Sequence, residues 1–223
     1  MVVPTICNQI PDSRIWIVRD GSILGARGAI DISDPNSQDA IGKVNLRSTV
    51  TGYYLRKFLD TNINLSAQTI TSTYHYFPVI RLADIYLLYA EAMNEAYGPN
   101  DAADLGWTAL EALNKVRTRA GITVPYTTTS QTEMTKKIRN ERRVELAFED
   151  QRYFDLRRWK TAEKDLNQPL MGFRIERQDN GVVSTHEFVV DGQRKFNTKM
   201  YYSPIPYSEM QLNTNLVQNP GWR

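Results

Sequence analysis

The sequence has little of what metal and disulfide sites require. Among its 223 residues are one cysteine, Cys7, and two histidines, His75 and His186, which are far apart in the chain. A single cysteine excludes an intrachain disulfide and a cysteine-based metal cluster. Two distant histidines argue against a histidine-rich metal site. We therefore expect neither a bound metal nor a cofactor.

Long apolar runs and an excess of one charge are also absent. No stretch approaches the roughly 20 apolar residues of a membrane-spanning helix. The opening residues, MVVPTICNQIPDSR, lack the basic start and apolar segment of an export signal. Lys+Arg 27 and Asp+Glu 25 leave a net charge of +2, which argues against binding nucleic acid by neutralising phosphates. Hydrophobic residues at 41% are enough to form a core.

Three parts are expected within one region, 1–223, since no low-complexity linker divides the chain. Residues 1–76 contain many turn formers and predict an irregular, loop-rich segment. Within it, short strands are expected near 14–18 and 69–76, and a short helix near 53–59.

Residues 77–160 predict a helical scaffold. An apolar stripe made by positions 82, 85, 89, 92 and 96 predicts a helix over about 81–97, which Gly98-Pro99 ends. A second helix is expected from about Asp101 to Ala120. We expect these two helices to form an antiparallel pair of tetratricopeptide-repeat length. A plain helical hairpin fits the pattern equally well.

Further helices and a β-hairpin are expected after this pair. SQTE at 130–133 has the pattern of a capping box and predicts a helix to about 148, followed by a shorter one over 152–160. In residues 161–223 apolar residues recur at every second position, the pattern of a β-strand. Two extended stretches flank Asn180-Gly181, a strong hairpin signal. An extended piece and a last short helix near 208 complete the chain.

Glu141 and Glu145 fall on the apolar stripe of the 130–148 helix. A buried carboxylate must be paired or protonated, because an unpaired buried charge costs several kcal/mol. The glutamates predict a structural ion-pair network, for which Arg117, Arg152 and Arg157 are expected partners, with Arg81 and Arg119 also available. A pair of catalytic carboxylates is the alternative, but it requires an open cleft.

Several motifs resemble the C-terminal part of the SusD/RagB family of outer-membrane nutrient-binding lipoproteins. They are, in order, FPVIRLADIYLLYAEAMNEA, ALNKVRTRAGI, IRNERRVELAFEDQRYFDLRRW, MYYSPIPYSEM and NLVQNPGW. One departure is Asp150, which stands where glycine is expected and can adopt left-handed geometry at modest cost.

The resemblance implies a mainly α, SusD-like scaffold with a tetratricopeptide-like helix pair, irregular loops and a small C-terminal β-hairpin. It also implies a cell-surface protein without enzymatic activity. Such a protein captures glycans or other nutrients for a SusC-like TonB-dependent outer-membrane transporter. Family members are longer, with a lipid anchor in an N-terminal half. We expect that half on the same or a separate chain.

Candidate ligand-binding residues are exposed aromatics and their polar neighbours, because aromatic faces match the apolar face of a sugar ring. They are Asp12, Arg14, Trp16, Tyr53 and Trp107. A helical-repeat protein–protein interaction module without a small ligand is the alternative function. A hydrolase is a third, which requires two carboxylates facing one solvent-filled cleft.

Overall fold

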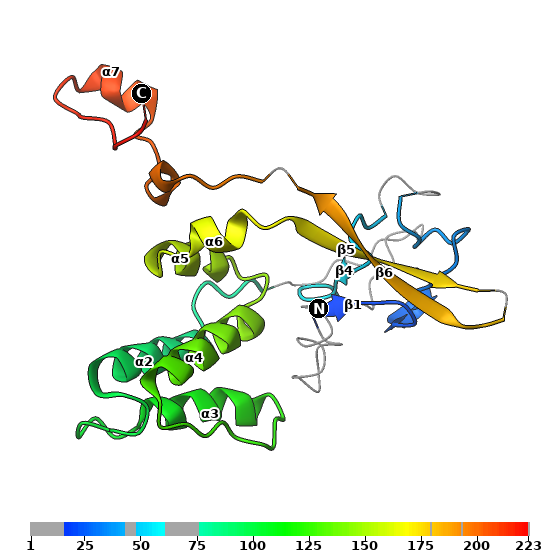
Figure 1. Cartoon of the computed structure of the whole chain (residues 1–223), viewed down its shortest axis with the longest axis horizontal. Helices are drawn as coiled ribbons and strands as arrows, with labels where there is room; N and C mark the ends of the chain where they lie inside the picture. Colours follow the sequence, from blue (N-terminus) through cyan, green and yellow to red (C-terminus); the bar gives the residue numbers. More distant parts are fainter. Residues whose placement is uncertain (1–15, 43–47, 61–75, 179, 193, 223) are drawn as a thin grey trace.

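The computed structural model describes residues 16–42, 48–60, 76–178, 180–192 and 194–222. Three helices pack together at one end: α2 (Leu82–Tyr97), α3 (Ala109–Arg119) and α4 (Gln131–Glu145). A long hairpin extends from the other side of the molecule (Figure 1). The expected mainly α fold with a small hairpin is confirmed.

Helices α2 and α3 form the expected antiparallel pair. The start of α3 lies beside the end of α2, because the Leu110 amide donates to the Pro99 carbonyl at 3.1 Å. The helix expected from Asp101 begins only at Ala109. Ala103 and Asp104 have positive φ, which a helix cannot contain. Thr108 and Glu111 then form a reciprocal capping box that sets the start.

The main core lies between α2, α3 and α4. Its large buried side chains include Leu87, Leu113, Met134 and Ile138, with alanines of α2 and α3 between them. Alanine has only a methyl group, so the helix axes can approach closely.

Except for Tyr89, which packs on Trp107, the apolar stripe predicted on α2 lies on its outward face. Leu82 is 66% exposed and Ile85 is 49% exposed, whereas Leu87 and Ala90 are fully buried. The helix is apolar on both sides, so the period alone could not identify the core side. Asp84 is among the polar residues on the buried side, where it pairs with Arg142 of α4.

Helix α4 ends at Glu145 rather than near 148, and α5 (Gln151–Arg158) follows. Phe148 and Asp150 take left-handed φ values of 64° and 60°, which end the first helix and redirect the chain into the second. Asp150 thus has the geometry expected of it. Helix α6 (Ala162–Leu166) was not predicted.

Short strands pair in the N-terminal part. Strand β1 (Ile17–Val18) pairs antiparallel with β4 (Tyr54–Leu55), and β2 (Ile23–Leu24) pairs with β3 (Gly28–Ala29). The helix expected near 53–59 is therefore wrong, because β1, distant in sequence, supplies a strand partner. The strand expected near 69–76 lies almost wholly outside the described residues.

Strands β5 (Leu170–Arg177) and β6 (Val183–Asp191) form the predicted hairpin. The N-terminal part packs on β5, where the Phe173 amide donates to the Thr51 carbonyl at 2.9 Å. Gly52 has φ +82°, and a Cβ there would lie 2.1 Å from the Phe173 carbonyl oxygen. Glycine is thus required where the two backbones approach.

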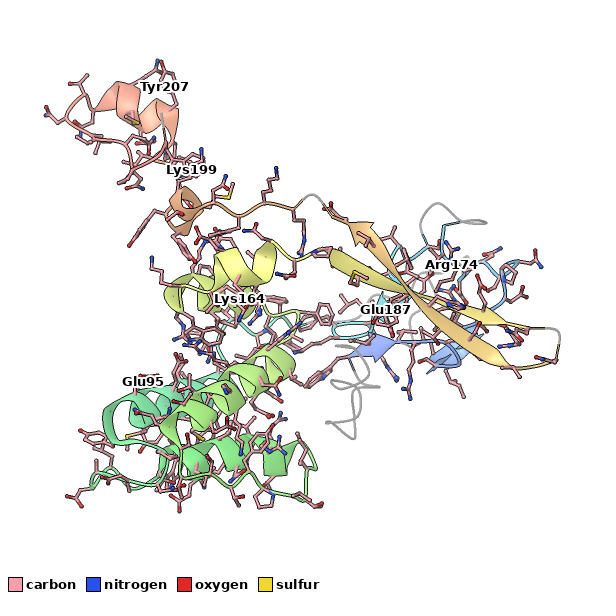
Figure 2. The ribbon with its side chains drawn as sticks, in the orientation of Figure 1. Glu95, Lys164, Arg174, Glu187, Lys199 and Tyr207 are labelled. Carbon is pink, nitrogen blue, oxygen red and sulfur yellow. The ribbon has the colours of Figure 1, made fainter. Side chains whose placement is uncertain are left out.

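From Phe196 to Tyr201 the C-terminal segment packs on α5 and α6, and beyond these residues it extends away from the helices (Figure 1). It contains a 3-10 turn, η3 (Thr198–Tyr201), where an extended piece was expected, and the short helix α7 (Tyr207–Leu212). Trp222 closes it by donating from Nε1 to the Lys199 and Tyr202 carbonyls at 3.0 and 2.9 Å. Figure 2 shows Tyr207 on this segment, at a distance from Glu95 on α2.

Candidate functional site

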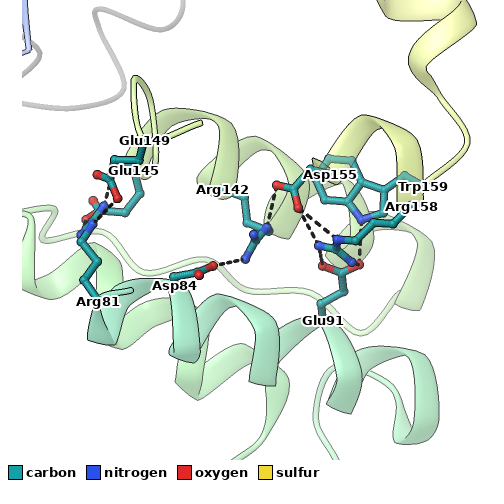
Figure 3. A network of polar contacts seen from close by, with 9 residues as sticks. All are labelled: Arg81, Asp84, Glu91, Arg142, Glu145, Glu149, Asp155, Arg158 and Trp159. Atoms are coloured by element: carbon teal, nitrogen blue, oxygen red, sulfur yellow. Dashed lines mark hydrogen bonds and ion pairs between the residues drawn. The ribbon is translucent and has the colours of Figure 1, made fainter. Parts of the chain in front are cut away.

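Glu145 and Glu149 are joined by Arg81, which precedes α2 (Figure 3). The Arg81 guanidinium donates to the Glu145 carboxylate and to the Glu149 carboxylate, each at 2.6 Å. Arg119 of α3 donates to the same Glu145 oxygen at 2.6 Å, and Lys57 pairs with Glu149. These contacts tie the N-terminal part, α2 and α3 to the α4–α5 connection.

Arg142 is the most deeply buried cation of the network, with its side chain 1% exposed. Its Nη1 donates to Asp84 and its Nε to Asp155, both at 2.8 Å. Figure 3 shows it lying between carboxylates of α2 and α5. The sequence prediction missed Arg142. It follows Ile138 by four and precedes Glu145 by three, so helical spacing could have placed it on the buried face.

Glu91 of α2 holds the end of α5. Arg158 pairs with both oxygens of its carboxylate, and Trp159 donates from Nε1 at 2.7 Å. Burial raises the pKa of Glu91, but the hydrogen bonds from Arg158 and Trp159 outweigh it and leave the pKa below its ordinary value. This carboxylate stays ionised at neutral pH.

Glu141 pairs with Arg117 of α3, whose Nη1 lies 3.1 Å from its carboxylate. Burial raises the pKa of Glu141 above its ordinary value, although Arg117 opposes the shift. The guanidinium also stacks on Tyr126, with its carbon 3.6 Å from the ring centre. The contact joins α3 to α4.

Arg152 and Arg157 take other partners than the predicted glutamates. Arg152 donates to Asp165 of α6 at 3.0 Å. Arg157 donates to the Tyr153 carbonyl at 3.2 Å, and its guanidinium lies 3.4 Å from that ring centre. Both belong to α5, which begins after the left-handed turn at Asp150 has changed the direction of the chain. Because of that turn, spacing along the sequence predicted the wrong partners for both arginines.

The network is suited to holding helices together. Glu141, Glu145 and Asp155 are each at most 3% exposed and bonded to arginine. A glycosidase pair must flank a space that holds substrate and water, which buried and paired carboxylates do not provide. In the described part of the chain, no group of three or more His, Cys, Asp or Glu side chains is arranged to hold a metal ion.

Two of the predicted binding aromatics flank the β1–β4 pair. Trp16 is partly buried, and the Lys57 ammonium lies 5.0 Å from its ring centre. Tyr53, also partly buried, packs edge-on against Phe173 with ring centres 5.9 Å apart. Asp12 and Arg14 lie outside the described residues.

Trp107 borders a shallow groove along α3. The groove has a volume of about 470 Å³, and its lining is Trp107, Glu111, Asn114, Lys115, Thr118 and Arg119. The positions from Glu111 to Arg119 recur three and four apart on one face of α3, and Trp107 lies just before the helix begins. The sequence prediction named only Trp107, and this spacing was the signal that could have found the rest.

Contacts hold the Trp107 ring in place. Tyr86 and Tyr89 of α2 pack on it with ring centres 5.3 and 6.5 Å away. The Lys115 ammonium lies 4.2 Å from the ring centre. Trp107 as a whole residue remains 39% exposed. The groove thus combines a fixed aromatic ring with donors and acceptors, the surface chemistry that sugars bind.

None of the helices in the described residues has the length and apolar character required to cross a membrane.

Comparison with known proteins places these features in a family. The profile of the SusD family matches residues 34–222. A SusD-like protein of Formosa agariphila is 33% identical over 159 residues, which cover 65% of this chain and 24% of that protein. A second from the same organism is 31% identical over 159 residues, 68% of this chain and 26% of that protein.

Solved structures that superpose on this chain are also SusD-like proteins. A SusD-like protein from Bacteroides fragilis superposes with a TM-score of 0.75 at 29% identity, over 96% of this chain and 39% of that one. A SusD-like carbohydrate-binding protein from the same organism gives a TM-score of 0.68 at 25% identity, over 91% of this chain and 40% of that one. The matched region is about a quarter of the length of the curated relatives, so the chain corresponds to only part of them.

Proposed function

Because this chain belongs to the SusD family, we propose that it forms part of a cell-surface protein that binds glycans for nutrient uptake. The observation that carries the proposal is the similarity along nearly the whole chain to a SusD-like protein described as carbohydrate binding. In the proposed arrangement, a lipid anchor holds the protein at the outer membrane. The ligand passes to a SusC-like TonB-dependent transporter.

The proposed role is capture without cleavage. Glycan binding needs an exposed aromatic face and hydroxyl partners, whereas hydrolysis needs two carboxylates at an open cleft. The buried glutamates of α4 have arginine partners instead. Incubation with polysaccharide should leave its chain length unchanged, and carbohydrate electrophoresis measures this. Shortened products that one carboxylate substitution abolishes would contradict it.

Within this function, Trp107 is the proposed sugar contact. Lys115 covers part of the ring, but an exposed cation–π contact contributes only about 0.5–1 kcal/mol. A sugar can therefore displace the flexible lysine at small cost. Thr118 and Asn114 lie on the same groove and provide polar side chains close to the ring.

Affinity electrophoresis against neutral and acidic polysaccharides tests the contact. Once a ligand is found, Trp107→Ala should weaken its binding by about tenfold, since stacking on one aromatic ring contributes about 1.4 kcal/mol. Tyr207→Ala is the matched control, because Tyr207 is 75% exposed and lies on the distant α7. Equal affinity of both variants and the wild type would exclude this contact. Failure of the wild type to bind any polysaccharide would count against the function itself.

The exposed face of α2 favours a second candidate, a protein–protein interaction module. Both roles are compatible in a transporter subunit. Co-purification with the transporter from membranes, without added glycan, tests the protein–protein interaction.

A further inference from the structure

The groove along α3 contains an ammonium group that is not held in an ion pair. The Lys115 ammonium lies 4.2 Å from the Trp107 ring centre, and in the part of the chain that the structure describes no carboxylate lies within ion-pair distance of it. Glu111, one turn earlier on the same face, accepts from the Thr108 amide at 2.8 Å. The hydrogen bonds from Thr108 lower the pKa of Glu111 most, and Lys115 contributes least. The charge of Lys115 is therefore available to a ligand.

Arg119 adds a second cation to the groove, one turn beyond Lys115. Its side chain is 61% exposed and donates to Glu145 at 2.6 Å. A guanidinium has further N–H donors, and those of Arg119 have no hydrogen-bond partner among the described residues. Glu145 is shared with Arg81, so it does not cancel the charge of Arg119. The groove is therefore positively charged.

Displacement of Lys115 from Trp107 distinguishes neutral sugars from anionic ones. A neutral sugar that stacks on the ring removes the cation–π contact and offers the ammonium only hydroxyl groups. A sugar with a carboxylate or a sulfate ester offers a charged acceptor, and such hydrogen bonds are roughly twice as strong as neutral ones. The flexible stem of lysine lets the ammonium move from the ring to this acceptor. The same movement is unfavourable with a neutral ligand and compensated with an anionic one.

We propose that the groove selects a glycan with an anionic substituent, and that Lys115 recognises this substituent when a sugar ring stacks on Trp107. The substituent is a uronate carboxylate or a sulfate ester, since both present oxygens that accept from an ammonium. Arg119 extends the positive surface along α3 for the next sugar of the chain. The inference rests on the proposed glycan binding and names its ligand class.

Two matched pairs of polysaccharides test the ligand class. Affinity electrophoresis compares polygalacturonate with its carboxyl-reduced form, and dextran sulfate with dextran. We expect the anionic member of at least one pair to bind at least about tenfold more tightly than its neutral partner, a difference of about 1.4 kcal/mol. The pair that shows the difference distinguishes carboxylate from sulfate. The difference should disappear in about 1 M salt, where charges are screened beyond about 3 Å.

Substitution of Lys115 tests the residue. Methionine retains an unbranched apolar side chain beside Trp107 without the charge, so Lys115→Met should weaken binding of the anionic member by about tenfold and leave binding of the neutral member unchanged. Lys115→Arg keeps the charge and should keep the preference. Lys136→Met is the matched control, because it removes one exposed charge from α4, and it should also keep the preference. Lys115 is exposed, so all variants should retain the wild-type Tm.

Equal binding of the anionic and neutral members would overturn the inference and leave the glycan function intact. Equal losses in Lys115→Met and Lys136→Met would also overturn it, because they would reveal only a general attraction of surface cations to a polyanion. Polyglutamate carries carboxylates without sugar rings and should bind more weakly than polygalacturonate. If it binds as tightly, the groove recognises acidic peptides and the inference is wrong. If no polysaccharide binds, the proposed function fails and the inference fails with it.

Discussion

Arg142 shows at the level of one residue how this fold contains charge. Its guanidinium is buried between Asp84 and Asp155. Desolvating a cation costs several kcal/mol, which two hydrogen-bonded carboxylates offset. Arginine fits because its planar group donates in several directions and remains protonated.

Removing Arg142 should therefore be costly. Arg142→Ala is expected to destabilise the chain by about 3–5 kcal/mol, since it leaves the buried Asp84 without a cation and Asp155 with Arg158 alone. Urea unfolding of the 223-residue chain measures this. Arg143→Ala is the control, because the neighbouring arginine is exposed and should change stability by less than about 0.5 kcal/mol. Similar effects of the two substitutions would mean that burial of Arg142 does not matter.

The raised pKa of Glu141 predicts that its contribution to the stability of the folded chain changes with pH in the opposite direction to that of most paired carboxylates. Burial raises its pKa in the folded chain above the ordinary value of 4.5, so the folded state holds the proton more tightly than the unfolded state. The stability that protonated Glu141 contributes is fully present below pH 4.5 and is lost as the pH rises through the raised pKa.

Glu141→Gln mimics the protonated form and lacks this titration. The wild type should therefore lose stability relative to the variant as the pH rises from 4 to 8. Unfolding curves of the two proteins over this range measure the difference, because their other titrating groups are the same. A wild type that instead gains relative stability would mean that Arg117 lowers the pKa.

At the level of the element, an N-terminal cap determines where α3 begins. Residues 101–108 have helix-compatible composition, yet the helix begins only after Thr108. The Thr108 side chain accepts from the Glu111 amide at 3.0 Å, and Glu111 accepts from the Thr108 amide at 2.8 Å. The hydrogen bond from the Thr108 backbone lowers the pKa of Glu111.

Loss of this cap should destabilise the chain modestly. Thr108→Ala is expected to cost about 1 kcal/mol, because it removes the hydroxyl acceptor at the N-cap. Thr108→Ser retains the acceptor and should stay close to the wild type. Thermal unfolding followed by circular dichroism separates the two. If serine is as harmful as alanine, the methyl group rather than the cap is responsible.

At the level of the whole molecule, stability is unevenly distributed. The α2, α3 and α4 group has a continuous core, whereas α7 has no buried residue. Few buried contacts allow a segment to open without global unfolding.

Hydrogen exchange should reveal this difference. In the 223-residue chain, amides of α7 should exchange at least about a hundredfold faster than those of α4, the factor for roughly 2.7 kcal/mol. Mass spectrometry of peptides from 207–212 and 131–145 measures both. Equal protection would show that α7 unfolds only with the helical core. Truncation after Pro206 should then lower the Tm of the core.

Much of the local structure was determined by the sequence alone. The 3.6-residue period and the Ser130 cap predicted the helices, and Asn180-Gly181 predicted the β5–β6 hairpin. These features depend on neighbours a few residues away, so they can be read without a fold. The place of two glutamates on an apolar helix face likewise implied that arginines would be needed beside them.

Only the tertiary structure decided which surfaces meet. It placed the Leu82 stripe of α2 outside and Leu87 inside, although both are apolar. It joined Arg117 to Glu141 across 24 residues and Arg81 to Glu149 across 68, and gave Arg152 and Arg157 other partners. The period of a helix specifies which residues share a face. What covers that face depends on contacts between distant segments, which local spacing does not contain.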